Sequence, residues 1–133
     1  MATELRTDGP HSPEYTREVG RVLAEAVRVL NYATLAEAPG LGYPGDAYTL
    51  IADLYTATSR MPQLAGQIKN FLDGWQASGQ LADDHGADVN ERIAAAGYHL
   101  GLAHGAASDL TRALQQAQNA ISGLYVKENP DAT

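Results

Sequence analysis

The chain has 133 residues, a formal net charge of −7 and 44% hydrophobic residues, which is enough for one domain with a core. The nine basic residues form no cluster, and this disfavours binding to nucleic acid or to an anionic membrane surface, because both need a basic face. The absence of cysteine excludes disulfides, thiolate metal sites and cysteine nucleophiles.

The N-terminal residues 1–12 are polar and are interrupted by Gly9 and Pro10, so we expect a disordered arm. They contain no apolar segment typical of a signal peptide. No stretch of the chain approaches the ~20 apolar residues of a membrane-spanning helix. We therefore expect a cytoplasmic protein that does not enter a membrane.

The first predicted helix runs from Pro13 to about Ala36. Ser12 is suited to be its N-cap, Pro13 suits the first helical position, and Glu14 adds an acid to the first turn. Charged residues occupy the opposite face, which indicates exposure to solvent. The apolar stripe has alternating spacings of four and three residues: Tyr15, Val19, Val22, Ala26, Val29 and Ala33.

Residues 38–45 contain two prolines and three glycines, which predict a loop that reverses the chain. Asp46 is then expected to cap a second helix that ends near Ser78, with Gly79 as a left-handed cap. Pro62 lies inside this segment, yet the apolar spacing continues through it without a change of phase. We therefore favour one arm kinked at Pro62 over two helices split there, which would make four helices in all.

The last predicted helix begins after Asp88, where Asp88 and Glu91 form a capping box, and ends near Val126. Its apolar stripe never changes spacing: Val89, Ile93, Ala96, Leu100, Ala103, Ala107, Leu110, Leu114, Ala117, Ile121 and Leu124. Three long helices with short connections predict an all-α, antiparallel up-down-up bundle. Residues 13–126 are expected to form this single domain, followed by a loose tail at 127–133.

The last helix has an unusual surface, because Asp109 and Arg112 are the only charged residues between Ile93 and Val126. Glycines at 97, 101 and 105 repeat every four residues, which indicates close approach by another group. One interpretation is close packing within the protein's own bundle. Our hypothesis is a second stripe that packs against another subunit or another helical protein, formed by Ala94, Tyr98, Gly101, Leu102 and Gly105.

The histidines do not form a recognisable metal or catalytic site. His85 lies among acidic residues, but their spacing matches no metal-binding loop. His99 and His104 project about 140° apart on one helix and cannot share an ion. His104 invites comparison with histidine phosphotransfer bundles, in which lysine follows three residues later, whereas here that residue is Ala107. We expect no metal, cofactor or catalytic residue.

Two segments, Arg60-Met-Pro-Gln-Leu-Ala-Gly-Gln-Ile and Ala113-Leu-Gln-Gln-Ala-Gln-Asn-Ala-Ile-Ser-Gly-Leu, resemble small uncharacterised helical proteins of actinobacteria. This resemblance implies a helical fold and carries no function. The position of Trp75, just before the turn at Ser78-Gly79, resembles that of the tryptophan in the Trp-x-Gly helical hairpins exported by type VII secretion. However, Ala77 replaces the glycine of that motif, and Asn129 stands where the export signal beginning at Tyr125 needs an acid.

The predicted function is that of a non-enzymatic, self-associating protein-interaction bundle that acts through its last helix. Two alternatives remain: a small-ligand or phosphorelay bundle that uses His99 or His104, and an exported helical protein of the type VII kind.

Overall fold

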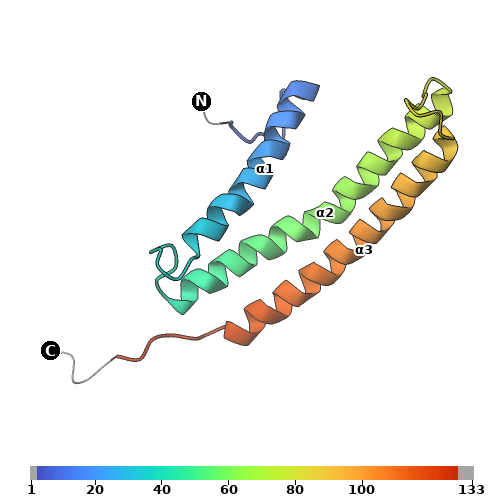
Figure 1. The fold of residues 1–133 in the computed structure, drawn as a ribbon. Helices are drawn as coiled ribbons and strands as arrows, with labels where there is room; N and C mark the ends of the chain where they lie inside the picture. Colours follow the sequence, from blue (N-terminus) through green and yellow to red (C-terminus); the bar gives the residue numbers. More distant parts are fainter. Residues whose placement is uncertain (1–2, 129–133) are drawn as a thin grey trace. The chain divides into compact units, whose positions relative to one another are not determined.

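In the computed structural model of this chain, residues 3–128 are described. Within that range there are three α-helices and no strand: α1 (Pro13–Ala33), α2 (Pro44–Ser78) and α3 (Val89–Ile121) (Figure 1). The prediction of an all-helical fold is therefore confirmed. The chain separates into two compact units, Met1–Tyr43 and Pro44–Thr133. Residues 1–2 of the expected arm and 129–133 of the expected tail lie outside the described residues, and the up-down-up order of the helices stays a prediction.

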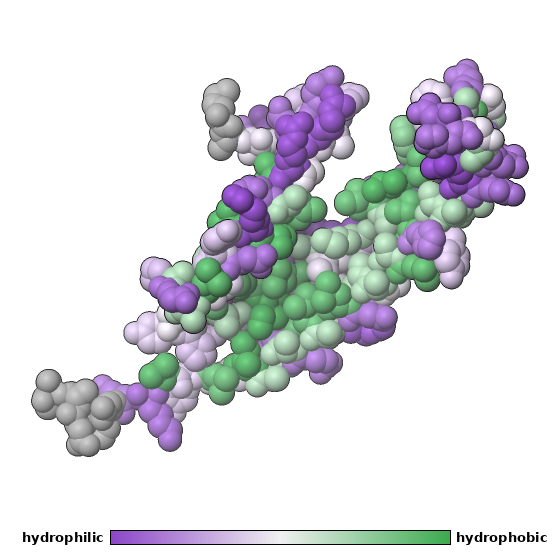
Figure 2. All heavy atoms as spheres, viewed as in Figure 1, coloured by the Kyte–Doolittle hydropathy of each residue, from purple (hydrophilic) through white to green (hydrophobic). Residues whose placement is uncertain are grey.

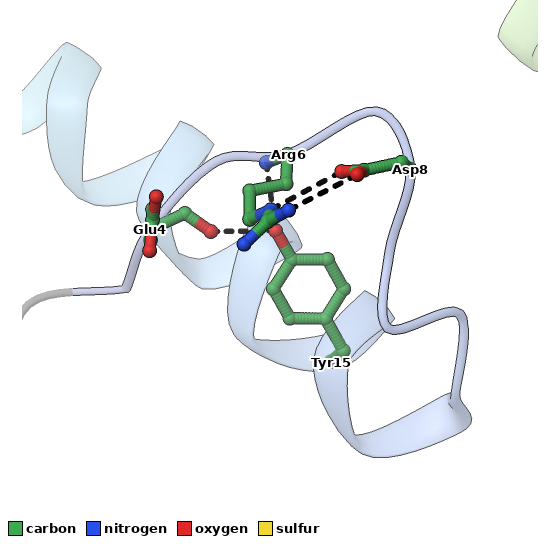
Figure 3. Close-up of polar contacts among 4 residues, drawn as sticks. All are labelled: Glu4, Arg6, Asp8 and Tyr15. Carbon is green, nitrogen blue, oxygen red and sulfur yellow. Dashed lines mark hydrogen bonds and ion pairs between the residues drawn. The ribbon is translucent and has the colours of Figure 1, made fainter.

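The segment that precedes α1 contacts the first turn of the helix through Tyr15 (Figure 3). The Tyr15 hydroxyl donates to the carbonyl of Glu4 and accepts the backbone N–H of Arg6 at 2.9 Å. The Arg6 guanidinium pairs with the Asp8 carboxylate at 3.0 Å. Ser12 caps the helix as predicted, because its hydroxyl accepts the backbone N–H of Tyr15 at 3.1 Å.

α1 ends at Ala33, three residues before the predicted end at Ala36. Thr34 takes the C-cap position, where its backbone N–H donates to the Leu30 carbonyl at 3.0 Å and its hydroxyl donates to the same oxygen at 2.7 Å. The returning loop then closes tightly on the helix end. A Cβ added to Gly40 would lie 1.9 Å from the carbonyl oxygen of Ala33, so only glycine fits there.

α2 begins at Pro44, so the prediction that Asp46 caps this helix is wrong. Proline suits the first helical position, and Asp46 lies within the first turn. The helix is continuous through Pro62. The preference for one arm over two helices is therefore confirmed, and a kink at Pro62 stays a prediction.

α3 returns alongside α2, and the two helices pack against each other (Figure 1). A pair of hydroxyl groups joins the two helices, with Thr111 Oγ1 2.8 Å from Thr58 Oγ1. The Thr111 hydroxyl also lies 2.7 Å from the Ala107 carbonyl oxygen, and the Thr58 hydroxyl donates to the Tyr55 carbonyl. Thr58 is 5% exposed and is the one buried residue in the described helices. Both hydroxyl groups are satisfied, as buried polar groups must be.

The turn between α2 and α3 is organised by Asp83. Its carboxylate accepts the backbone N–H groups of His85 at 2.9 Å and Ala87 at 3.1 Å. It also pairs with Arg92 of α3 at 3.1 Å. The N–H groups of Ala87 and His85, and then the charge of Arg92, lower the pKa of Asp83. Gly79 has a φ of +71°, which confirms the predicted left-handed cap of α2.

α3 begins as predicted and ends earlier than predicted. The Asp88 carboxylate caps the helix by accepting backbone N–H groups, including that of Glu91. The predicted end near Val126 is wrong, because the helix ends at Ile121. Gly123 follows with a φ of +82°, a left-handed conformation that ends helices.

The side of α3 that faces α2 differs from the predicted stripe beyond Leu100. Ala103, Leu110 and Ala117 are exposed, whereas Thr111 and Gln118 are half-buried. A straight helix drifts by about 20° per heptad against a strict seven-residue pattern, which moves such positions off the contact. On the face in Figure 2, hydrophobic residues lie along both helices and hydrophilic residues gather over their connecting turn.

The hydrophobic residues of the described range are covered only in part. None of them reaches full burial, and many large ones remain exposed. Among the described helices, none is both long and apolar enough to cross a membrane.

Candidate interface on the last helix

The five residues of the hypothesis lie together on one side of α3. Ile93 and Leu100 are half-buried toward α2, and at about 100° per residue the five project roughly 80° to 180° around the helix from Ile93. All five are exposed. The Tyr98 side chain is 65% exposed and that of Leu102 is 53% exposed. We call the surface formed by Ala94, Tyr98, Gly101, Leu102 and Gly105 the α3 face.

The three glycines of α3 have different surroundings. A Cβ added to Gly97 would lie 3.2 Å from Cε of Lys69, so Gly97 permits close approach to a side chain of α2. A Cβ at Gly101 or at Gly105 would meet nothing within 4 Å. Packing within the protein's own fold therefore accounts for Gly97. Gly101 and Gly105 leave an open notch beside the Tyr98 and Leu102 side chains.

The α3 face is bordered by charges and carries none itself. Between Ile93 and Ser108 there is no aspartate, glutamate, lysine or arginine. Glu91 lies one turn before the face, and Asp109 and Arg112 lie beyond its other end, where they form an ion pair with each other. An uncharged, partly apolar centre with charged ends is typical of a protein interface.

The histidines of the alternative hypothesis, His99 and His104, are also exposed. The His99 ring lies edge-on to Tyr98, with 5.2 Å between the ring centroids. His104 is exposed on the same helix, and its carbonyl accepts the Ser108 hydroxyl. Within residues 3–128, no three histidine or acidic side chains are placed to hold a metal ion.

Two cavities lie near the turn between α2 and α3, and neither is lined by histidine. The larger has a volume of about 500 Å³ and lies beside Phe71 and Trp75. The smaller has a volume of about 140 Å³ and lies beside Asp83 and Arg92. Asn70, Ser78 and Gln80 add polar groups to the wall of the first cavity, and the Asp83–Arg92 ion pair borders the second.

A second exposed apolar surface was missed by the sequence analysis. It lies in the C-terminal half of α2 and is formed by Leu64, Ile68, Phe71 and Trp75, of which Phe71 is 65% exposed and Trp75 43% exposed. Ile68 and Trp75 belong to the apolar spacing that continues through Pro62, and both were expected to be covered. The missed signal is that Leu64 and Phe71 join them in a second run, with spacings of four, three and four residues.

No family model, curated protein or solved structure matches this chain.

Proposed function

We propose that this protein is a non-enzymatic interaction module that associates with a second copy of itself through the α3 face. The observation that carries the proposal is the open surface around Gly101 and Gly105, flanked by the exposed Tyr98 and Leu102 side chains. Full burial of a large apolar side chain contributes roughly 1.5–3 kcal/mol. Covering Tyr98 and Leu102 on both copies is therefore a substantial driving force for association.

The distribution of charge favours this face as the contact between like copies. Each chain carries a net charge of −7, so most surfaces of two copies repel each other. The segment from Ile93 to Ser108 has no such charge to bring into contact or to desolvate. A glycine notch also lets a second backbone approach closely, which increases van der Waals contact.

The test is the absolute mass in solution over a wide concentration range, by sedimentation or light scattering. We expect a dimer that dissociates on dilution to the 14.1 kDa chain. Gly101→Leu or Gly105→Leu fills the notch and holds the second copy away, so the dissociation constant should rise at least about tenfold, equivalent to ~1.4 kcal/mol. Helicity should be kept, because leucine favours helix more than glycine does.

The matched control is Ala103→Leu. It adds the same side chain to an exposed position of α3, about 160° around the helix from Gly105. The control should associate as the parent does. A monomer at every concentration would overturn the proposal, and so would an unchanged dimer in both glycine variants.

A further inference from the structure

The exposed side of α3 is arranged symmetrically about one point, midway between Gly101 and Leu102. Tyr98 and Gly105 are equally far from this point, one on each side. Farther out, the pairs Ala94 with Asp109 and Glu91 with Arg112 are also equally far from it. The residues of this seam, in chain order, are Glu91, Ala94, Tyr98, Gly101, Leu102, Gly105, Asp109 and Arg112.

Two copies of a helix that pair antiparallel about a two-fold axis bring equidistant residues opposite each other. An axis at this point sets Tyr98 of one copy against Gly105 of the other, and Leu102 against Gly101. Each large side chain then meets a glycine where an added Cβ has no neighbour within 4 Å. In a parallel pair Tyr98 would meet Tyr98 and Gly105 would meet Gly105, which gives overcrowding at one level and a void at the next.

The charges at the two ends of the seam select the same arrangement. In the antiparallel pair the Glu91 carboxylate of one copy faces the Arg112 guanidinium of the other, and symmetry repeats this contact. Arg112 is already ion-paired with Asp109 within its own chain, so it would lie between two carboxylates. In the parallel pair Glu91 faces Glu91 and Arg112 faces Arg112, and like charges repel.

We propose that α3 pairs antiparallel with α3 of a second copy, about a two-fold axis between Gly101 and Leu102, with each Tyr98 ring seated over the other copy's Gly105. This inference rests on the proposed function and adds the orientation and register of the contact. Glu91 and Arg112 are the residues that set the orientation.

Cysteine cross-linking tests the arrangement in the full chain, because the natural sequence contains no cysteine. The variants are Ala94→Cys and Asp109→Cys, which lie at the edge of the α3 face and leave Tyr98 and both glycines of the notch in place. In the antiparallel pair, positions 94 of the two copies are about 22 Å apart at ~1.5 Å per residue, beyond disulfide reach. Position 94 of one copy lies opposite position 109 of the other.

We expect each variant alone to give no disulfide-linked dimer under mild oxidation and an equimolar mixture of the two to give it. Cross-linking by Ala94→Cys alone would show a parallel contact, which overturns this inference and leaves the proposed function standing. A dimer by mass that cross-links in neither experiment overturns the register. A monomeric mass for both variants and for the parent chain overturns the proposed function itself.

Discussion

At the scale of single residues, Gly40 lies against the end of α1 with no room for a side chain. The Cβ of any other residue would fall 1.9 Å from the Ala33 carbonyl oxygen, and that oxygen belongs to the backbone and has little freedom to move. Gly20, inside α1, is the opposite case, because an added Cβ there meets nothing within 4 Å. The two glycines form a matched pair for the same substitution.

We expect Gly40→Ala to destabilise the N-terminal unit by about 1–3 kcal/mol, since the loop must shift to relieve the overlap. Gly20→Ala should stabilise it by roughly 0.5–1 kcal/mol, because alanine loses less conformational freedom in a helix interior. Thermal unfolding followed by circular dichroism measures both. Equal effects of the two substitutions would contradict the tight closure of the loop on α1.

Residues with a local signal were predicted correctly from the sequence. Ser12 and Asp88 cap their helices because a short polar side chain before an apolar pattern satisfies free N–H groups. Helix ends were predicted less well. Thr34 and Gly123 stop their helices while helix-forming residues continue beyond them, so the pattern alone ran too far.

At the scale of elements, the turn between α2 and α3 depends on the Asp83 carboxylate. Its pKa is lowered from the ordinary value of 3.8, mainly by the N–H groups of Ala87 and His85 and less by Arg92. A carboxyl group with a lowered pKa stabilises the fold at pH values above its pKa in the unfolded chain. That contribution is lost as the pH falls through the lowered pKa of the folded state.

We expect Asp83→Asn to lower the Tm of the protein at pH 7. The difference in Tm from the parent should shrink as the pH falls below 3.8, the range in which the parent also loses its carboxylate. Asp84→Asn, the same change at the exposed neighbouring residue, is the control and should show no such trend. A difference for Asp83→Asn that stays constant with pH would contradict this role of the charge.

The continuity of α2 could be read from the sequence because the apolar phase is unchanged across Pro62. The side of each helix that the other helix covers could be predicted from the sequence only in part. α2 carries two apolar stripes, and its own pattern does not say which one α3 covers. The choice depends on tertiary packing, and the half-buried Thr111 shows that a polar side chain can occupy a contact position that the apolar pattern gives to Leu110.

At the scale of the whole molecule, the candidate interface was predicted from the absence of charged residues along α3, which the sequence alone shows. The sequence left open whether the glycines serve packing inside the chain or contact with another chain. The structure separates these two roles. A Cβ at Gly97 would contact Lys69 of α2, whereas a Cβ at Gly101 or Gly105 would meet nothing within 4 Å. The exposed surface around Phe71 was not predicted, because large apolar residues were assumed to be covered.

Association of two chains of charge −7 should strengthen with salt. Raising NaCl from about 0.05 to 0.5 M shortens the screening length severalfold and reduces the repulsion between copies. Exposed pairs such as Glu91 with Arg112 set the orientation of the two copies but add little to the affinity in either condition. We expect the dissociation constant, measured by sedimentation, to fall severalfold. The Gly105→Leu variant should stay weakly associated throughout, which excludes general salting-out, and weaker association of the parent at high salt would contradict the expectation.

Thr58, the one buried residue of the described helices, has a consequence for motion within the second unit. Thr58 is the least exposed residue of α2 and α3, and no described hydrophobic residue is fully buried. Local opening should therefore be frequent near the helix ends and rarest around the Thr58–Thr111 pair. Amide hydrogens would then exchange with solvent slowest around Thr58 in α2 and Thr111 in α3, with protection declining toward the ends of both helices. The hydroxyl pair would mark the last part of this hairpin to open.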